Sequence, residues 1–125
     1  MKKILIVEDN EINLKLIKTV LKTKGYLLVE ARDGEEALKS VTSERPDIIL
    51  MDIQIPKVDG LEVTRRIRDM KDLRDIPIIG LTAHAMEGDR KKILEAGCDG
   101  YIAKPINTRT FIVEIEAILK KKAEG

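Results

Sequence analysis

Short apolar runs of strand length alternate along this 125-residue chain with segments whose apolar residues recur at helical spacing. The first run covers residues 3–7, and Ile12, Leu16 and Val20 then repeat at the intervals of one helix face. The alternation predicts a series of strand–helix units. Strands are expected at residues 3–7, 27–31, 48–51, 78–81 and 100–103, and helices near residues 12–24, 34–45, 61–70, 87–96 and 111–119.

This alternation limits the sheet to a parallel arrangement with helices on both faces. The runs are apolar throughout, as strands are when both faces of a sheet are covered. Right-handed crossovers then place helices on each side of the sheet. The predicted fold is therefore α/β with a doubly wound parallel sheet, in which a ligand binds beyond the carboxyl ends of the strands.

Charge and hydropathy exclude several classes of function. The 23 basic and 22 acidic residues nearly cancel, so the chain lacks the positive field of a nucleic-acid-binding protein. The apolar run at residues 4–7 ends at Glu8, which is too short for a signal peptide or a membrane span. The single cysteine, Cys98, cannot form an internal disulfide. We expect a cytoplasmic protein that binds neither nucleic acid nor membranes.

Polar residues follow every predicted strand except the second. Glu8 and Asp9 come after the first strand, Asp52 after the third, Thr82 after the fourth and Lys104 after the fifth. Because parallel strands bring their carboxyl ends to one edge of a sheet, these side chains should converge. Each of them, taken alone, could be an ordinary turn, cap or surface residue. Their combination is what indicates a site.

Carboxylates gathered at one edge of a sheet need a cation between them. At a separation of about 5 Å and an effective dielectric near 20, each pair repels by about 3 kcal/mol. Oxygen ligands suit Mg²⁺, which is typically held by one or two carboxylates and several waters. We predict a Mg²⁺ site with Asp9 and Asp52 as direct ligands. The backbone carbonyl of Gln54 is a candidate third ligand, and Glu8 is expected to act through water.

A carboxylate, a hydroxyl and an ammonium group beside Mg²⁺ suit phosphoryl transfer, where catalysis is mostly positioning and neutralisation of charge. Asp52 is the predicted phosphoacceptor, because carboxylates attack phosphorus to give aspartyl phosphates. Lys104 would place a positive charge beside the phosphoryl group. Thr82 would turn its hydroxyl toward a new phosphoryl oxygen.

Five motifs follow one another along the chain: Ile-Val-Glu-Asp at 6–9, Leu-Met-Asp at 50–52, Pro56 with Gly60, Leu-Thr-Ala at 81–83 and Lys-Pro at 104–105. In this order they resemble the motifs of the receiver domains of two-component response regulators, over residues 2–119. Within that family the chain is most similar to single-domain regulators of cell division and polarity of the DivK type, and to receiver modules of hybrid kinases. The resemblance implies one receiver domain over residues 1–125 without an output domain, and a flavodoxin-like sheet in strand order 2-1-3-4-5 with five helices.

The resemblance also implies how such a domain receives its signal. A sensor histidine kinase or a histidine phosphotransfer protein would phosphorylate Asp52, and Asp9 with Glu8 would bind Mg²⁺. The Lys104–Pro105 peptide bond would be cis, a form that X-Pro bonds adopt at modest cost. The domain would then be a signalling switch rather than an enzyme.

A switch of this kind implies a change of surface. Thr82 would move toward the phosphoryl group, and Tyr101 on the last strand would rotate inward, although Tyr101 could instead simply pack in the core. The surface formed by the fourth helix, the fifth strand and the fifth helix would change and bind a downstream protein. A complete shift between two states needs about 5.5 kcal/mol of preferential stabilisation, to which a few charge-assisted hydrogen bonds contribute a large part.

Three positions depart from the common pattern of the family or vary within it. Glu8 stands where many members carry Asp, which should alter the affinity for Mg²⁺. Gln54 and His84 flank the approach of attacking water. We predict that these two residues set the lifetime of the phosphorylated form.

Two other functions fit the same fold class. A Mg²⁺-dependent phosphatase with an aspartyl nucleophile commonly has a second acidic residue two positions after the nucleophile, and this chain has Gln54 there. A flavin- or nucleotide-binding module needs glycines that let the backbone approach a phosphate. The loop at residues 8–11 is acidic and lacks them, which counts against that function.

Overall fold

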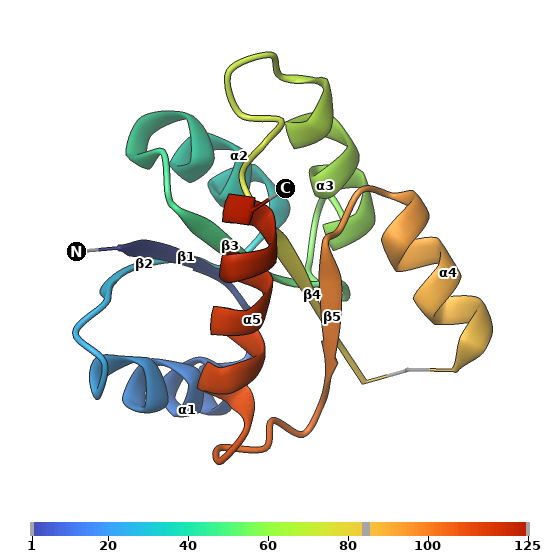
Figure 1. The fold of residues 1–125 in the computed structure, drawn as a ribbon. Helices are drawn as coiled ribbons and strands as arrows, with labels where there is room; N and C mark the ends of the chain where they lie inside the picture. Colours follow the sequence, from blue (N-terminus) through green and yellow to red (C-terminus); the bar gives the residue numbers. More distant parts are fainter. Residues whose placement is uncertain (1, 84–85, 125) are drawn as a thin grey trace.

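The computed structural model describes residues 2–83 and 86–124, and it contains a parallel sheet in the predicted order β2-β1-β3-β4-β5 (Figure 1). His84 lies outside the described residues, so its predicted role is not tested by the structure. The strands are β1 (Lys3–Val7), β2 (Leu27–Ala31), β3 (Ile48–Asp52), β4 (Ile78–Thr82) and β5 (Gly100–Ala103). The helices are α1 (Glu11–Lys22), α2 (Gly34–Glu44), α3 (Gly60–Asp69), α4 (Glu87–Glu95) and α5 (Phe111–Glu124).

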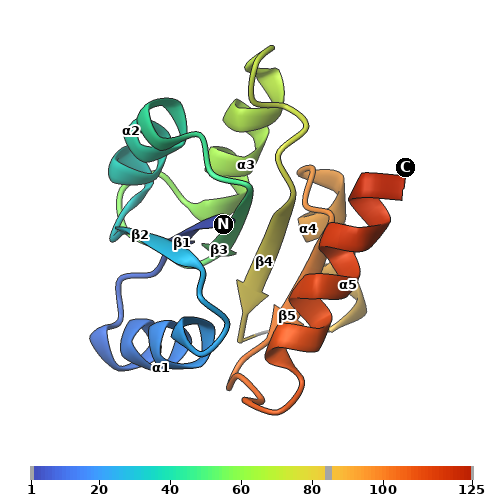
Figure 2. The ribbon, with the colours of Figure 1, turned by 60° about the vertical axis from the view of Figure 1, so that its left-hand side comes forward.

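Helices cover both faces of the sheet and divide the core in two (Figure 2). On one face α1 and α5 pack against Ile4 and Ile6 of β1, with the fully buried Phe111 among their contacts. On the other face α2, α3 and α4 pack against Leu5 and Val7 of the same strand. Because alternate residues of a strand point to opposite faces, one uninterrupted apolar run supplies both halves of the core.

We predicted that every strand is covered on both faces, but the strand β2 is more exposed than that prediction allows. Only Ala31 is fully buried in this strand, and Leu27 is 49% exposed. The reason is its place in the sheet, since β2 lies at one end and pairs only with β1. Glu30 of this partly exposed strand forms an ion pair with Lys18 of α1 at 2.5 Å.

Capping residues determine where several helices begin. Asn10, Asp33 and Asp59 each accept a hydrogen bond from the backbone N–H three residues further on. Gly97 has a φ of +114° just after α4, as expected of a glycine at a helix C-terminus. Within the described ranges, no helix is long and apolar enough to span a membrane.

Parallel pairing places the carboxyl ends of the central strands side by side. Val7 of β1 pairs with Met51 of β3, and Asp52 of β3 pairs with Leu81 of β4. The residues directly after β1 therefore lie beside the end of β3, and Thr82 lies one position beyond the partner of Asp52. This register positions the candidate site.

Candidate functional site

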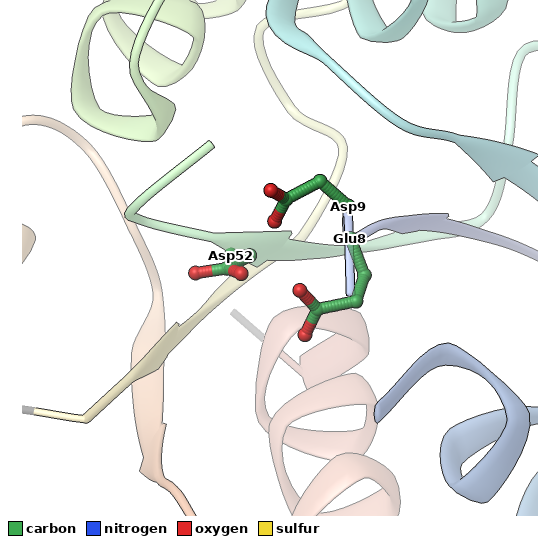
Figure 3. Close-up of side chains that lie close together, drawn as sticks. All are labelled: Glu8, Asp9 and Asp52. Atoms are coloured by element: carbon green, nitrogen blue, oxygen red, sulfur yellow. The ribbon is translucent and has the colours of Figure 1, made fainter. Parts of the chain in front are cut away.

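Three carboxyl groups meet at the carboxyl edge of the sheet (Figure 3). Glu8 and Asp9 follow β1 and Asp52 ends β3, and one oxygen of each lies within 4.8 Å of the other two. Glu8 and Asp52 are 0% and 3% exposed, whereas Asp9 is open to solvent. Two buried carboxylates and one exposed carboxylate thus border the same small space.

Lys104 connects the two buried carboxylates. Its Nζ lies 2.8 Å from Oδ2 of Asp52 and 2.9 Å from Oε1 of Glu8. The backbone N–H of Lys104 donates to the carbonyl of Thr82 at 2.7 Å, which fixes the start of the loop after β5 to the end of β4. The Lys104–Pro105 peptide bond is cis, as the family resemblance implied.

Asp52 is held from both sides of its carboxyl group. Oδ1 accepts a hydrogen bond from the backbone N–H of Gln54 at 2.9 Å, while Oδ2 contacts Lys104. The side chain of Gln54 itself is exposed at the start of the loop between β3 and α3. Gly60, the first residue of α3, packs so closely that a Cβ there would lie 2.4 Å from the carbonyl oxygen of Asp52. The carboxyl group therefore has a fixed position at the end of a rigid strand.

The site is short of positive charge. Burial raises the pKa of Glu8 from its ordinary value of 4.5 to about 7; the neighbouring Asp52 also raises it, and Lys104 opposes both effects. Burial would lower the pKa of Lys104, but its bonds to Asp52 and Glu8 outweigh burial and raise that pKa. Oε1 of Glu8 is buried and has no well-aligned hydrogen bond, although the ammonium is close. One ammonium group is thus shared by two buried carboxylates.

The structure brings together Glu8, Asp9, Asp52 and Lys104, with Gln54 and Thr82 directly beside them. Thr82 is 4% exposed at the end of β4. Tyr101 lies on β5 apart from this cluster, half-buried and packed against the core beneath α2, α3 and α4.

The contacts of two other residues are not predicted from the sequence. Lys57 adopts a φ of +66° in the loop between β3 and α3, and its Nζ lies 3.4 Å from carboxylates of Asp33 and Glu35. Arg90 of α4 places its guanidinium carbon 5.5 Å from the centre of the Tyr101 ring. No spacing pattern in the sequence indicates the contacts of Lys57 or Arg90, because these contacts depend on how separate elements pack.

The family model for the response regulator receiver domain matches residues 4–116 of this chain. The chain therefore belongs to the response regulator receiver domains of two-component signalling, the class whose fold and strand-end residues it shares. The match confirms the resemblance on which the strand order and the function were predicted. It does not favour the alternative of a Mg²⁺-dependent phosphatase.

Individual relatives support the same assignment. The polar-differentiation response regulators DivK of Brucella anthropi and Brucella ovis are each 48% identical to this chain over 118 residues, covering 94% of it and 96% of the relative. The predicted similarity to regulators of the DivK type is confirmed by these matches.

Solved structures share the fold over nearly the whole chain. A putative response regulator from Chloroflexus aurantiacus superimposes with a TM-score of 0.91 at 30% identity, covering 95% of this chain and 98% of the other. The receiver domain of the sensor histidine kinase PA1611 from Pseudomonas aeruginosa gives a TM-score of 0.85 at 40% identity, covering 99% and 98%. That second structure has a magnesium ion coordinated in its active-site cleft.

Proposed function

We propose that this chain is a phosphoacceptor switch that takes a phosphoryl group onto Asp52 with Mg²⁺ and regulates partner proteins by contact. The observation that carries the proposal is the placement of Asp52. Its carboxyl group is buried at a strand end, fixed by Gln54 on one oxygen and by Lys104 on the other, beside the acidic pair Glu8 and Asp9. A nucleophile held in this way suits a reaction that depends on alignment.

The residues present fit a magnesium ion. The cluster offers only oxygen ligands, which a hard divalent cation prefers, and the Lys104 ammonium group contacts two of its three carboxylates. Asp9 and Asp52 would bind the ion directly, and the carbonyl of Gln54 would be a third ligand. Glu8 is fully buried and already contacts Lys104, which supports an indirect role through water. Bound Mg²⁺ would supply positive charge for the phosphoryl oxygens.

The transfer itself needs little chemistry from the protein. An oxygen of Asp52 forms a bond to phosphorus while the P–N bond of a phosphohistidine donor breaks, and the imidazole leaves with the bonding electrons and takes up a proton. Lys104 lies within hydrogen-bonding distance of Asp52. Its ammonium group can therefore contact the carboxylate before the transfer and the new phosphoryl oxygens after it. Thr82 at the end of β4 offers a hydroxyl at the same edge of the sheet.

Membership of the family supports the proposed donor, and we extend the proposal to the downstream target. A sensor histidine kinase or a histidine phosphotransfer protein would supply the phosphoryl group. The downstream partner would bind the face formed by α4, β5 and α5, after Thr82 and Tyr101 have moved. The change at the site that drives this movement is the added negative charge and the added oxygen acceptors next to Lys104.

The experiment that tests this proposal measures covalent phosphorylation. Incubation with Mg²⁺ and acetyl phosphate is expected to add one phosphoryl group per chain, visible by intact mass spectrometry as an acid-stable, base-labile adduct. Removal of Mg²⁺ with a chelator should prevent its formation. Sustained hydrolysis of phosphate monoesters over many turnovers, without an accumulating adduct, would contradict the proposal and favour a phosphatase.

The affinity for Mg²⁺ is expected to depend on pH near neutrality. Because the pKa of Glu8 is about 7, this carboxyl group is mostly ionised at roughly pH 8 and mostly protonated at roughly pH 6. A cation favours the ionised form, so the affinity should fall by up to about tenfold from the higher pH to the lower. Isothermal titration calorimetry with MgCl₂ at both pH values measures this change.

Substitution of Glu8 provides the control. Glu8→Gln should remove most of the pH dependence, since the amide does not titrate in this range. Retention of the full tenfold change in Glu8→Gln would show that another group is responsible.

The raised pKa of Glu8 also affects the stability of the protein without metal. The contribution of neutral Glu8 to the free energy of unfolding is fully present below about pH 4.5 and is lost as the pH rises through about 7.

A further inference from the structure

Among the residues that the structure describes, side-chain hydrogen bonds attach the turn after α4 to its neighbours. Arg68 of α3 donates from Nε to the carbonyl of Gly97 at 2.9 Å and from Nη2 to Oδ2 of Asp99 at 2.8 Å. The same oxygen of Asp99 accepts the backbone N–H of Ile78 at 2.9 Å. These bonds fix the turn between α4 and β5 to both α3 and β4.

The remainder of α4 has few contacts with the core. Ile93 is the one residue of this helix that is buried, and Met86 at its N-terminus provides no side-chain cap. Met86 is 77% exposed and Leu94 is 48% exposed. Figure 1 shows α4 at the β5 end of the sheet, where β5 is the nearest strand. Segments with little buried apolar surface are displaced at low cost, so the N-terminal half of α4 is the easier half to move.

Arg90 lies in this less buried half of α4 and contacts Tyr101 of β5. Its guanidinium carbon lies 5.5 Å from the centre of the Tyr101 ring, within the range of a cation–π interaction. Arg90 precedes Ile93 by one helical turn, and Tyr101 is half-buried below it. In the same conformation Lys104 contacts the carboxylates of Asp52 and Glu8. The stacking therefore belongs to the state in which the lysine is bound to the unmodified acceptor.

We propose that Arg90 is a positioning residue of the switch, which holds Tyr101 and the N-terminal half of α4 in this resting conformation. The inference rests on the proposed function. When Tyr101 turns inward, its ring leaves the guanidinium group, and the stacking is lost. A contact made in only one of two states biases the equilibrium toward that state. Arg90 thus opposes activation, and its removal favours binding of a phosphoryl group by the same factor.

The test compares the affinity for beryllofluoride, a phosphoryl mimic, in the presence of Mg²⁺. Arg90→Met removes the charge and keeps the length of the side chain, and it is expected to tighten binding about two- to fivefold, the range of one exposed cation–π contact. Arg90→Lys should give a smaller change than Arg90→Met, because a lysine keeps a cation over the ring although it stacks less well than an arginine. Lys91→Met is the matched control, since Lys91 is the next residue of α4, its side chain is 78% exposed, and it should leave the affinity unchanged.

A double-mutant cycle separates the stacking from a general effect on the helix. In a Tyr101→Leu background, Arg90→Met should no longer change the affinity for beryllofluoride. An equal change with and without Tyr101, or no change in Arg90→Met while the wild-type protein binds beryllofluoride, would overturn the inference alone. Failure of the wild-type protein to bind beryllofluoride would overturn the proposed function, and this inference with it.

Discussion

Asp52→Asn is expected to abolish phosphorylation by acetyl phosphate, lowering the yield of adduct by about a hundredfold or more because an amide does not form an acyl phosphate. The substitution preserves the shape of the side chain, and its Oδ1 can still accept the N–H of Gln54. Lys104 retains Glu8 as a partner, so the fold should survive. Intact mass spectrometry after incubation with Mg²⁺ and the donor measures the yield.

Asp47 offers a control at the other end of the strand that carries Asp52. It directly precedes β3, at the opposite end from Asp52, and its Oδ2 accepts the backbone N–H of Lys3 at 2.7 Å. Asp47→Asn makes the same chemical change away from the carboxyl edge of the sheet, and phosphorylation should proceed as in the wild-type protein. An adduct at normal stoichiometry in Asp52→Asn would show that another residue is the acceptor.

The convergence of the site could be predicted because it depends on topology rather than on detailed packing. Once the strands are parallel, every residue that follows a strand lies at the same edge, whatever the length of the intervening helices. The observed pairing agrees with that rule: Val7 pairs with Met51, and Asp52 pairs with Leu81. Strand boundaries were found to within one residue, since apolar runs end where polar residues reach the rim.

What could not be predicted depends on distances between elements. The sequence shows that Glu8 is acidic, but its complete burial and its contact with Lys104 follow from the placement of the loop after β5. The exposure of β2 follows from its place at the end of the sheet. The stacking of Arg90 on Tyr101 joins a helix to a strand, and no spacing in the sequence signals it.

Gly60 presents the largest expected effect on stability. Gly60→Ala would place a Cβ 2.4 Å from the carbonyl oxygen of Asp52 and 2.8 Å from the Cα of Ile53. Both are backbone atoms at the end of β3, so α3 must move away or the strand end must shift. We expect a loss of about 3 kcal/mol in the free energy of unfolding, measured by urea denaturation, which is a large share of the stability of a domain of this size.

The consequence of Gly60→Ala should extend to the site, because the atom that it displaces belongs to the proposed acceptor. Phosphorylation by acetyl phosphate should therefore slow even in the fraction that remains folded. Gly88 in α4 is the matched control: a Cβ there meets no atom within 4 Å, so Gly88→Ala should increase stability by up to about 1 kcal/mol and leave phosphorylation unchanged. Equal stability of Gly60→Ala and the wild-type protein would mean that α3 adjusts without strain, and that the close contact of Gly60 with Asp52 does not hold the acceptor in place.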